Sequence, residues 1–494
     1  MSEADNLKLK VARTIKWNAI DRVATQLLYA VTGVVLARLL SHSDYGLVAA
    51  IMVFQAFATL FVDSGFASAL IQRKKPSHLD YSTVMWFNIG VAVVIYIILF
   101  FAAPLIADIF KKDMRIIPLS RVMFLTFIIN ATAIVPANRL VKMMQVKMIA
   151  VSNSVGLVFS AVVGITLALT GWGAWALVWQ AITLATVKSA ILWLTSEWRP
   201  LLKFSVASLR SFFNFGSGVM ATSFLNVAFQ EIYAFFIGNR VGLVSLGYYS
   251  QADKWSKMGI SSLAQVLGAS FLPALSQVQD DPERFAAATS KMNRFTAYLL
   301  FPALGLLAVM AAPIFHSLFG TKWDASIGLF QILLVRGVFT VLQSLYNNYI
   351  MALGRSRLMI YTELLRDITA IIAILVTLPY ISLSSPDSLV EGVKIFLWGQ
   401  LAASALTWVA TLLIAVRLCH RPVISFLLDL TPYLMETLLI LVPVAAIALV
   451  VDNPLVTGIL QGVTGIALYM GINALLGSRI QRDVIGYFAH RFKG

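Results

Sequence analysis

The sequence contains little charge, few histidines and a single cysteine. Only 12% of its 494 residues are Asp, Glu, Lys or Arg, whereas soluble globular domains contain about a quarter. Apolar residues make up 59% of the chain, and the mean hydropathy is +0.83. This composition excludes an ordinary soluble globule and predicts an integral membrane protein.

The few cysteines and histidines also limit the chemistry. Cys419 is the only cysteine, which excludes an intramolecular disulfide. The five histidines are scattered without metal-ligand spacing, at His42, His78, His316, His420 and His490. We therefore expect no metal site, no cofactor and no catalytic residues.

Long hydrophilic segments are lacking as well. Apolar segments of membrane-spanning length occupy nearly the whole chain and leave no room for a soluble catalytic domain. A membrane glycosyltransferase, polymerase or ligase would need acids, bases or metal ligands in sizeable outward loops. The outward loops are short, so we do not expect an enzyme.

The apolar segments themselves predict an all-α membrane protein. A segment of about 20 apolar residues crosses a bilayer as a helix. We count about fourteen transmembrane helices, centred near residues 27, 58, 95, 130, 159, 184, 226, 262, 298, 339, 369, 403, 441 and 466.

The basic residues are sorted between alternate loops. A net charge of +15 could indicate nucleic acid, but the cations form no single patch, and we expect no nucleic-acid partner. Most of the basic residues, including Arg73, Lys74 and Lys75, lie in loops on the same side of the membrane as the N-terminus. The loops on the opposite side hold far fewer, chiefly Lys111, Lys112, Arg115, Arg240 and Lys322. The positive-inside rule then places both termini in the cytoplasm.

Polar residues recur at helical spacing in the first two segments, residues 15–39 and 45–71. The first carries Asn18, Arg22 and Thr25 on one face, and the second carries Gln55 and Asp63. Polar and charged groups are costly in lipid, so these faces should meet other helices or a water-filled space.

A weak internal repeat predicts a second copy of this pattern. Residues 38–46 are echoed by residues 239–247, an offset of about 200 residues, and repeated halves are common in transporters. The seventh segment then carries Asn226, Gln230 and Glu231, and the eighth carries Asp253, Lys254, Lys257 and Gln265. We predict that segments one, two, seven and eight converge on one cationic cleft.

The repeat also suggests boundaries. We expect a six-helix lobe at residues 1–196 that includes a cytoplasmic N-terminal segment, and a basic cytoplasmic linker at 197–213. A second six-helix lobe follows at 214–417, and two further transmembrane helices with a cytoplasmic tail occupy 418–494.

Several charged residues allow two readings. Arg22 either extends to the interface, paired with Asp21, or lines the cleft. Asp63 and Asp253 either neutralise neighbouring cations or exchange an ion. Arg366, with Glu363 and Asp367 nearby, is expected to form a structural ion-pair cluster.

Short motifs resemble a known family. Residues 36–40 (LARLL), 44–46 (DYG) and 63–74 (DSGFASALIQRK) resemble the opening of Wzx-type polysaccharide flippases, of the colanic acid exporter branch. These belong to the multidrug/oligosaccharidyl-lipid/polysaccharide exporter superfamily. Further matches are FLPALS at 271–276, FPALG at 301–305 and LFGTKW at 318–323. The similarity extends to about residue 420 and is strongest in the first eighty residues.

The resemblance implies a carrier with two six-helix lobes in a V shape and two additional C-terminal helices. Its substrate would be an undecaprenyl-pyrophosphate-linked oligosaccharide, moved across the bacterial inner membrane for surface polysaccharide biosynthesis by alternating access. Membrane lipids and other polysaccharide-assembly proteins are the implied partners. A drug or metabolite antiporter of the same superfamily is the alternative. It would centre on an ion-exchanging carboxylate such as Asp63, Glu231 or Asp253.

Overall fold

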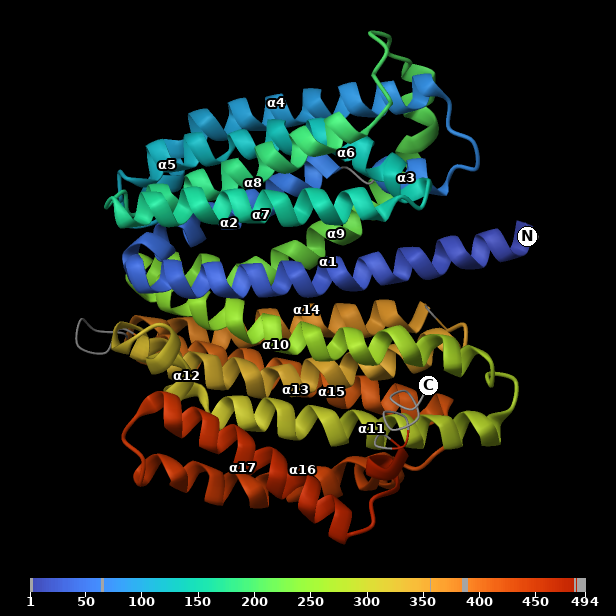
Figure 1. The fold of residues 1–494 in the computed structure, drawn as a ribbon, viewed down its shortest axis with the longest axis vertical. Helices are drawn as coiled ribbons and strands as arrows, with labels where there is room; N and C mark the ends of the chain where they lie inside the picture. The colour runs from blue at the N-terminus through green and yellow to red at the C-terminus, as the bar shows by residue number, and fades with distance from the viewer. Residues whose placement is uncertain (1–2, 64–65, 356, 384–389, 484–485, 487–494) are drawn as a thin grey trace. The chain divides into compact units, whose positions relative to one another are not determined.

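The computed structural model describes the whole chain except residues 1–2, 64–65, 356, 384–389, 484–485 and 487–494. In the described part, the regular structure is entirely helical (Figure 1). Helices occupy all fourteen predicted positions. Among the described residues, twelve helical segments are long and apolar enough to cross a membrane. The chain is therefore an all-helical, multi-pass membrane protein.

The chain divides into two compact units, Met1–Gly247 and Tyr248–Gly494. This division follows spatial contacts, whereas the lobes predicted from the repeat follow sequence similarity. The first unit contains α1 (Glu3–Leu39), α2 (His42–Asp63), α3 (Phe66–Gln72), α4 (His78–Ile109), α5 (Ile116–Met123), α6 (Leu125–Lys142), α7 (Val146–Leu169), α8 (Ala174–Thr195), α9 (Val206–Arg240) and the start of α10 (Leu243–Ser276).

The second unit contains the remainder of α10 and the helices that follow it. These are α11 (Pro282–Val309), α12 (Ala311–Leu318), η1 (Thr321–Trp323), α13 (Asp324–Ala352), α14 (Arg357–Thr377), η2 (Leu378–Leu383), α15 (Glu391–Leu418), α16 (Val423–Ala446), η3 (Ile447–Leu449) and α17 (Pro454–Leu475). The predicted second segment, residues 45–71, corresponds to α2 and α3, and residues 64–65 between them lie outside the description.

In the first unit, α7 packs against α1 and α8, α6 packs against α4 and α8, and α2 packs against α9. The start of α4 carries a capping box in which Ser77 and Asp80 satisfy each other's backbone N–H groups. Asp80 also accepts a hydrogen bond from the Ser208 hydroxyl at the start of α9. The cap of one helix therefore also anchors the beginning of another.

The linker between α8 and α9 is held against α4. The backbone N–H of Leu201 donates to the Ser82 hydroxyl over 2.9 Å, and Trp86 Nε1 donates to the Leu201 carbonyl over 2.8 Å. Trp198 is buried in an apolar cluster with Tyr81 and Met85 of α4. The basic linker thus has a defined path within the first unit.

In the second unit, α15 packs against α13 and α14, α11 packs against α13 and α16, and α17 packs against α12 and α16. Large aromatic side chains fill the space between α13 and its neighbours, and Tyr346, Tyr349, Phe396 and Phe426 are fully buried. Tyr349 donates to the Asn293 side chain over 2.9 Å, which satisfies its hydroxyl in an apolar environment.

Candidate functional site

Helix α1 exposes two opposite faces. Successive helical residues are about 100° apart, which places Asn18, Arg22 and Tyr29 on one side. The apolar residues Ile20, Val23, Leu27 and Val31 then occupy the other. All seven side chains are exposed within the unit. The apolar face suits lipid, and the polar face suits water or a polar ligand.

Thr25 lies at the edge of this polar face and turns toward α7. Its hydroxyl lies 3.4 Å from Asp21 Oδ1, and Asn153 of α7 donates to Asp21 Oδ2 over 3.2 Å. Asp21 therefore accepts hydrogen bonds from neutral groups, and Lys188 of α8 lies close enough to interact with it electrostatically. Within the described part of the chain, Arg22 forms no ion pair, so the suggested Arg22–Asp21 pairing is wrong, and Asp21 helps to fasten α1 to α7.

Helix α2 places Gln55 toward the interior of its own unit. Gln55 Nε2 donates to the Thr126 hydroxyl of α6 over 3.2 Å. On another part of the helix, Phe57 and Phe61 contact Phe224 of α9, with ring centroids 5.5 Å and 6.2 Å apart. The second and seventh predicted segments, α2 and α9, are thus neighbours in the first unit. The side chain of Asp63, at the end of α2, lies outside the described residues.

Helix α9 carries the predicted polar residues of the seventh segment. Asn226 and Gln230 are exposed, and Glu231 is half-buried. Phe224 and Leu225 beside them are exposed as well. This region of α9 therefore offers a mixed polar and aromatic surface, which suits a ligand with both polar and apolar parts.

Helix α10 carries the cations of the eighth segment, in the second unit. Lys257 Nζ lies 2.6 Å from Asp253 Oδ2, one turn earlier. Lys254 is exposed, with its ammonium 5.6 Å from the Trp255 ring centroid, and Gln265 is exposed two turns beyond Lys257. Among the described residues of α10, no large apolar side chain is exposed. The outer face of this helix is polar, and one of its two lysines is neutralised.

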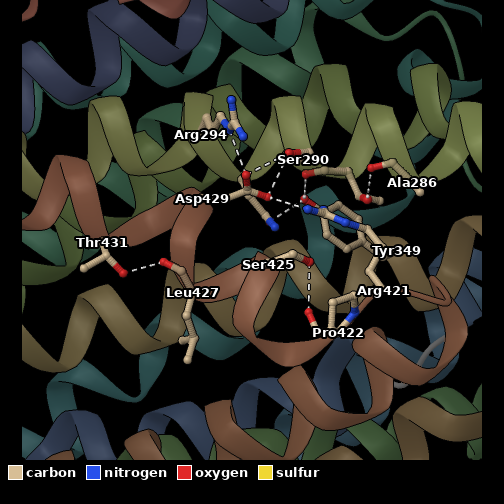
Figure 2. Close-up of polar contacts among 12 residues, drawn as sticks. Ala286, Ser290, Arg294, Tyr349, Arg421, Pro422, Ser425, Leu427, Asp429 and Thr431 are labelled. Carbon is tan, nitrogen blue, oxygen red and sulfur yellow. Dashed lines mark hydrogen bonds and ion pairs between the residues drawn. The ribbon is translucent and has the colours of Figure 1, made fainter. Parts of the chain in front are cut away.

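Figure 2 shows a charged network that the sequence analysis missed. Asp429 of α16 is 1% exposed and accepts hydrogen bonds from Arg294 over 2.7 Å, from Arg421 over 3.0 Å and from the Ser290 hydroxyl over 2.8 Å. At the sequence level, loop cations were used only to assign the topology, and neither arginine was singled out. One signal in the sequence could have revealed the network: Asp429 is an acidic residue within an apolar segment, eight positions after Arg421 in the preceding loop.

The predicted cluster around Arg366 is confirmed. Arg366 forms ion pairs with both Glu363 and Asp367 on α14. No group of three or more His, Cys, Asp or Glu side chains that could hold a metal ion occurs among the described residues. The predicted site residues offer cations, amides, hydroxyls and carboxylates on long helices, and these groups suit the binding of a polar or charged ligand.

Comparison with known proteins agrees with this reading. The family model described as "Polysaccharide biosynthesis protein" matches residues 35–328, more than half of the chain. The chain is 27% identical to the lipopolysaccharide biosynthesis protein WzxC of Escherichia coli (strain K12), over 71% of each protein. It is also 27% identical to the succinoglycan biosynthesis transport protein ExoT of Rhizobium meliloti (strain 1021), over 72% of each.

Solved structures show the same fold. The lipid II flippase MurJ in an inward closed conformation superposes with a TM-score of 0.71 at 16% identity, covering 95% of this chain and all of the other. An inward-facing multidrug resistance MATE family transporter gives a TM-score of 0.58 at 14% identity, covering 80% of this chain and 94% of the other. The chain belongs to the polysaccharide biosynthesis protein family, and its fold is that of the lipid II flippase and the MATE transporter.

Proposed function

We propose that this protein is a Wzx-type transporter of the multidrug/oligosaccharidyl-lipid/polysaccharide exporter superfamily and not an enzyme. It would move undecaprenyl-pyrophosphate-linked oligosaccharide repeat units across the bacterial inner membrane for surface polysaccharide biosynthesis. It would work by alternating access, with the lipid tail remaining in the bilayer. In the proposed architecture, α9 and α10 join the twelve apolar spans to give fourteen crossings, arranged as two six-helix lobes in a V and two C-terminal helices. At 35 and 34 residues, both helices are long enough to cross.

The observation that carries the proposal is the polar outer face of α10, which exposes Lys254 and Lys257 and no large apolar side chain among its described residues. A pyrophosphate carries at least two negative charges and needs several donors when it loses water. In this proposal Arg22, which is exposed on the polar face of α1, would supply a third cation. Asn18, Asn226, Gln230 and Gln265, which are exposed, would supply sugar and phosphate hydrogen bonds, while Asp63, Asp253 and Glu231 would set the charge balance. Thr25 and Gln55 form hydrogen bonds within the first unit and are not assigned to the substrate.

The antiporter alternative would require a carboxylate that exchanges an ion. Asp253 is the best described candidate, and its Oδ2 is held by Lys257 over 2.6 Å. A carboxylate paired with a lysine one turn away favours a charge-neutralising role. This observation supports the flippase over the antiporter.

The test is surface polysaccharide in a flippase-null strain complemented with each variant. A Lys254/Lys257→Gln double variant should nearly abolish export while its membrane abundance stays normal. Single changes should lower export partially, and a Lys254/Lys257→Arg variant should retain more export than the Gln variant because it keeps both charges. Lys74/Lys75→Gln removes the same charge from an exposed loop and serves as the control. Full export from the Lys254/Lys257→Gln variant would overturn the cationic site.

We further propose that both termini are cytoplasmic, on the basis of the positive-inside charge bias. The only cysteine, Cys419, is buried, so a Cys419→Ser background accepts single reporter cysteines. A cysteine at exposed Lys112 should react with an impermeant maleimide added outside the inner membrane, and one at exposed Lys75 should not. The opposite pattern would reverse the assigned topology.

A further inference from the structure

A cationic cavity of about 820 Å³ lies in the second unit, between α11, α16 and the segment that follows α17. Its polar lining includes Lys291, Arg294, Tyr433, Arg479, Arg482 and Asp483. None of its lining residues belongs to α10. The cavity is therefore distinct from the lysine-bearing face assigned to the transported substrate.

The lining has more positive than negative charge. Four cations and one carboxylate, Asp483, give a net charge of +3. Asp483 forms an ion pair with Lys291, whose Nζ lies 2.7 Å from Asp483 Oδ2. Within the described part of the chain, Arg479 and Arg482 form no direct salt bridge, although Arg482 acts electrostatically on Asp483 and donates a hydrogen bond to the Gly477 carbonyl over 3.1 Å. An excess of this size, at the edge of a membrane domain, attracts an anion.

The Asp429 network next to the cavity leaves this excess of positive charge intact. Arg294 contacts Asp429, but the same carboxylate also accepts a hydrogen bond from the more buried Arg421 (Figure 2). Arg421 alone can balance the charge of Asp429, and the Arg294 side chain remains 53% exposed. Arg294 can therefore donate toward an anion in the cavity while its Nε stays fixed by Asp429.

The position suits a molecule that is partly in lipid. Helix α11 has 28 residues and so is about 42 Å long, longer than the roughly 30 Å hydrocarbon core. Lys291 and Arg294 lie in its first four turns, near the interface. The buried side chain of Ile480 and the ring of Tyr433 add apolar surface to the lining. Met435 and Leu475 on the adjoining helices are exposed.

We propose that this cavity binds the headgroup of an anionic phospholipid. Its phosphodiester would contact Arg479, Arg482 and Arg294, and its acyl chains would lie along the exposed apolar side chains of α16 and α17. Zwitterionic lipids have the same phosphodiester but also a cation that the positive lining repels. The site consequently selects for net negative charge, as basic pockets at helix ends do.

The test uses purified full-length protein in neutral detergent at fixed ionic strength. Its melting temperature is measured while phosphatidylglycerol, phosphatidylcholine or inorganic pyrophosphate is titrated in. Phosphatidylglycerol should raise the melting temperature saturably, and the other two should not. An Arg479/Arg482→Gln variant should need at least about tenfold more phosphatidylglycerol for the same shift, since two charge-assisted contacts are lost.

The matched control is Arg284/Arg355→Gln, which removes the same charge from exposed residues of the same unit outside the cavity. The melting temperature of this control variant should depend on phosphatidylglycerol concentration as that of the unmodified protein does. Arg479 and Arg482 are exposed, so their variant should fold, as its lipid-free melting temperature will report. Equal stabilisation by phosphatidylcholine, an equal loss in the control, or an equal effect of pyrophosphate would each overturn the lipid site, the last by indicating a soluble-anion site.

Discussion

Gly46 of α2 packs against the first residue of α10, and Gly247 of α10 packs against the first residue of α2. Each is the fifth residue of its helix. A Cβ atom built on Gly46 would lie 1.8 Å from the carbonyl oxygen of Leu243, the first residue of α10. One built on Gly247 would lie 1.9 Å from the carbonyl oxygen of His42, the first residue of α2. This reciprocal contact packs the first turn of α2 directly against the first turn of α10.

The glycine contact predicts strong sensitivity to one methyl group. Gly46→Ala and Gly247→Ala should each lower the melting temperature and membrane abundance, because the obstructing atoms are backbone and cannot rotate away. Overpacking of this kind costs about 1–3 kcal/mol or more. Gly90→Ala, where a new Cβ meets nothing within 4 Å, is the control and should be neutral or slightly stabilising. Wild-type stability in both contact variants would show that the first turns of α2 and α10 do not approach so closely.

A second prediction concerns coupling through Asp253. Asp253→Asn should impair export because it leaves Lys257 without its partner at 2.6 Å and changes the charge offered to substrate. The pH at which export is greatest should stay the same, since the carboxylate neutralises a cation and carries no transported proton. Export is to be measured across pH in proteoliposomes or cells, with Asp280→Asn on an exposed loop as the control. A clear shift of the pH optimum would favour the antiporter mechanism.

A third prediction concerns the Asp429 network. Asp429→Asn should destabilise the protein by about 3–5 kcal/mol, because Arg421, only 14% exposed, would keep a buried and unpaired charge. Arg294→Gln should cost less, since Arg294 is 53% exposed and its removal leaves Asp429 paired with Arg421.

The control is Asp281→Asn, which breaks an exposed pair with Arg284 but keeps a good N-cap residue on α11. Thermal unfolding in detergent distinguishes the three variants. Equal small losses in all of them would mean that the network is solvated and contributes little.

A fourth prediction follows from the loop between α4 and α5. Hydrogen bonds from the Arg115 guanidinium lower the pKa of Asp113 below its usual value, and Arg115 also donates to the Ser43 hydroxyl near the start of α2. A carboxyl whose pKa is lowered in the folded state stabilises the protein above its unfolded pKa of about 4. This stabilisation is lost as the pH falls through the lower folded value.

Arg115→Gln should therefore lower the melting temperature near pH 7, and the difference from the parent should shrink as the pH falls below about 4. Arg115→Lys should restore part of the loss, because it keeps the charge without the paired donors. Melting temperatures measured between pH 3 and 7 test this expectation. A difference that is constant across that range would exclude the Asp113 linkage.

The helices and their polar faces could be predicted from the sequence because both depend on local pattern. Each apolar segment is long enough to satisfy its own backbone hydrogen bonds across a bilayer, whatever its neighbours are. The polar faces of α1 and α10 likewise follow from 3.6-residue periodicity, and Asn18, Arg22, Lys254, Lys257 and Gln265 are exposed in the structure. The ion pairs of Arg366 were predictable for the same reason, since Glu363 and Asp367 lie within one turn.

Only the tertiary structure decided which helices touch and which side chains meet across them. Asp429 and Arg294 are 135 residues apart, and nothing in either segment indicates the other. Asp21 is satisfied by Asn153 of α7 instead of its neighbour Arg22, and Gly46 meets Leu243 through a backbone contact that no side-chain pattern encodes. Periodicity determines which face of a helix is polar, but the packing of the whole bundle determines what that face meets.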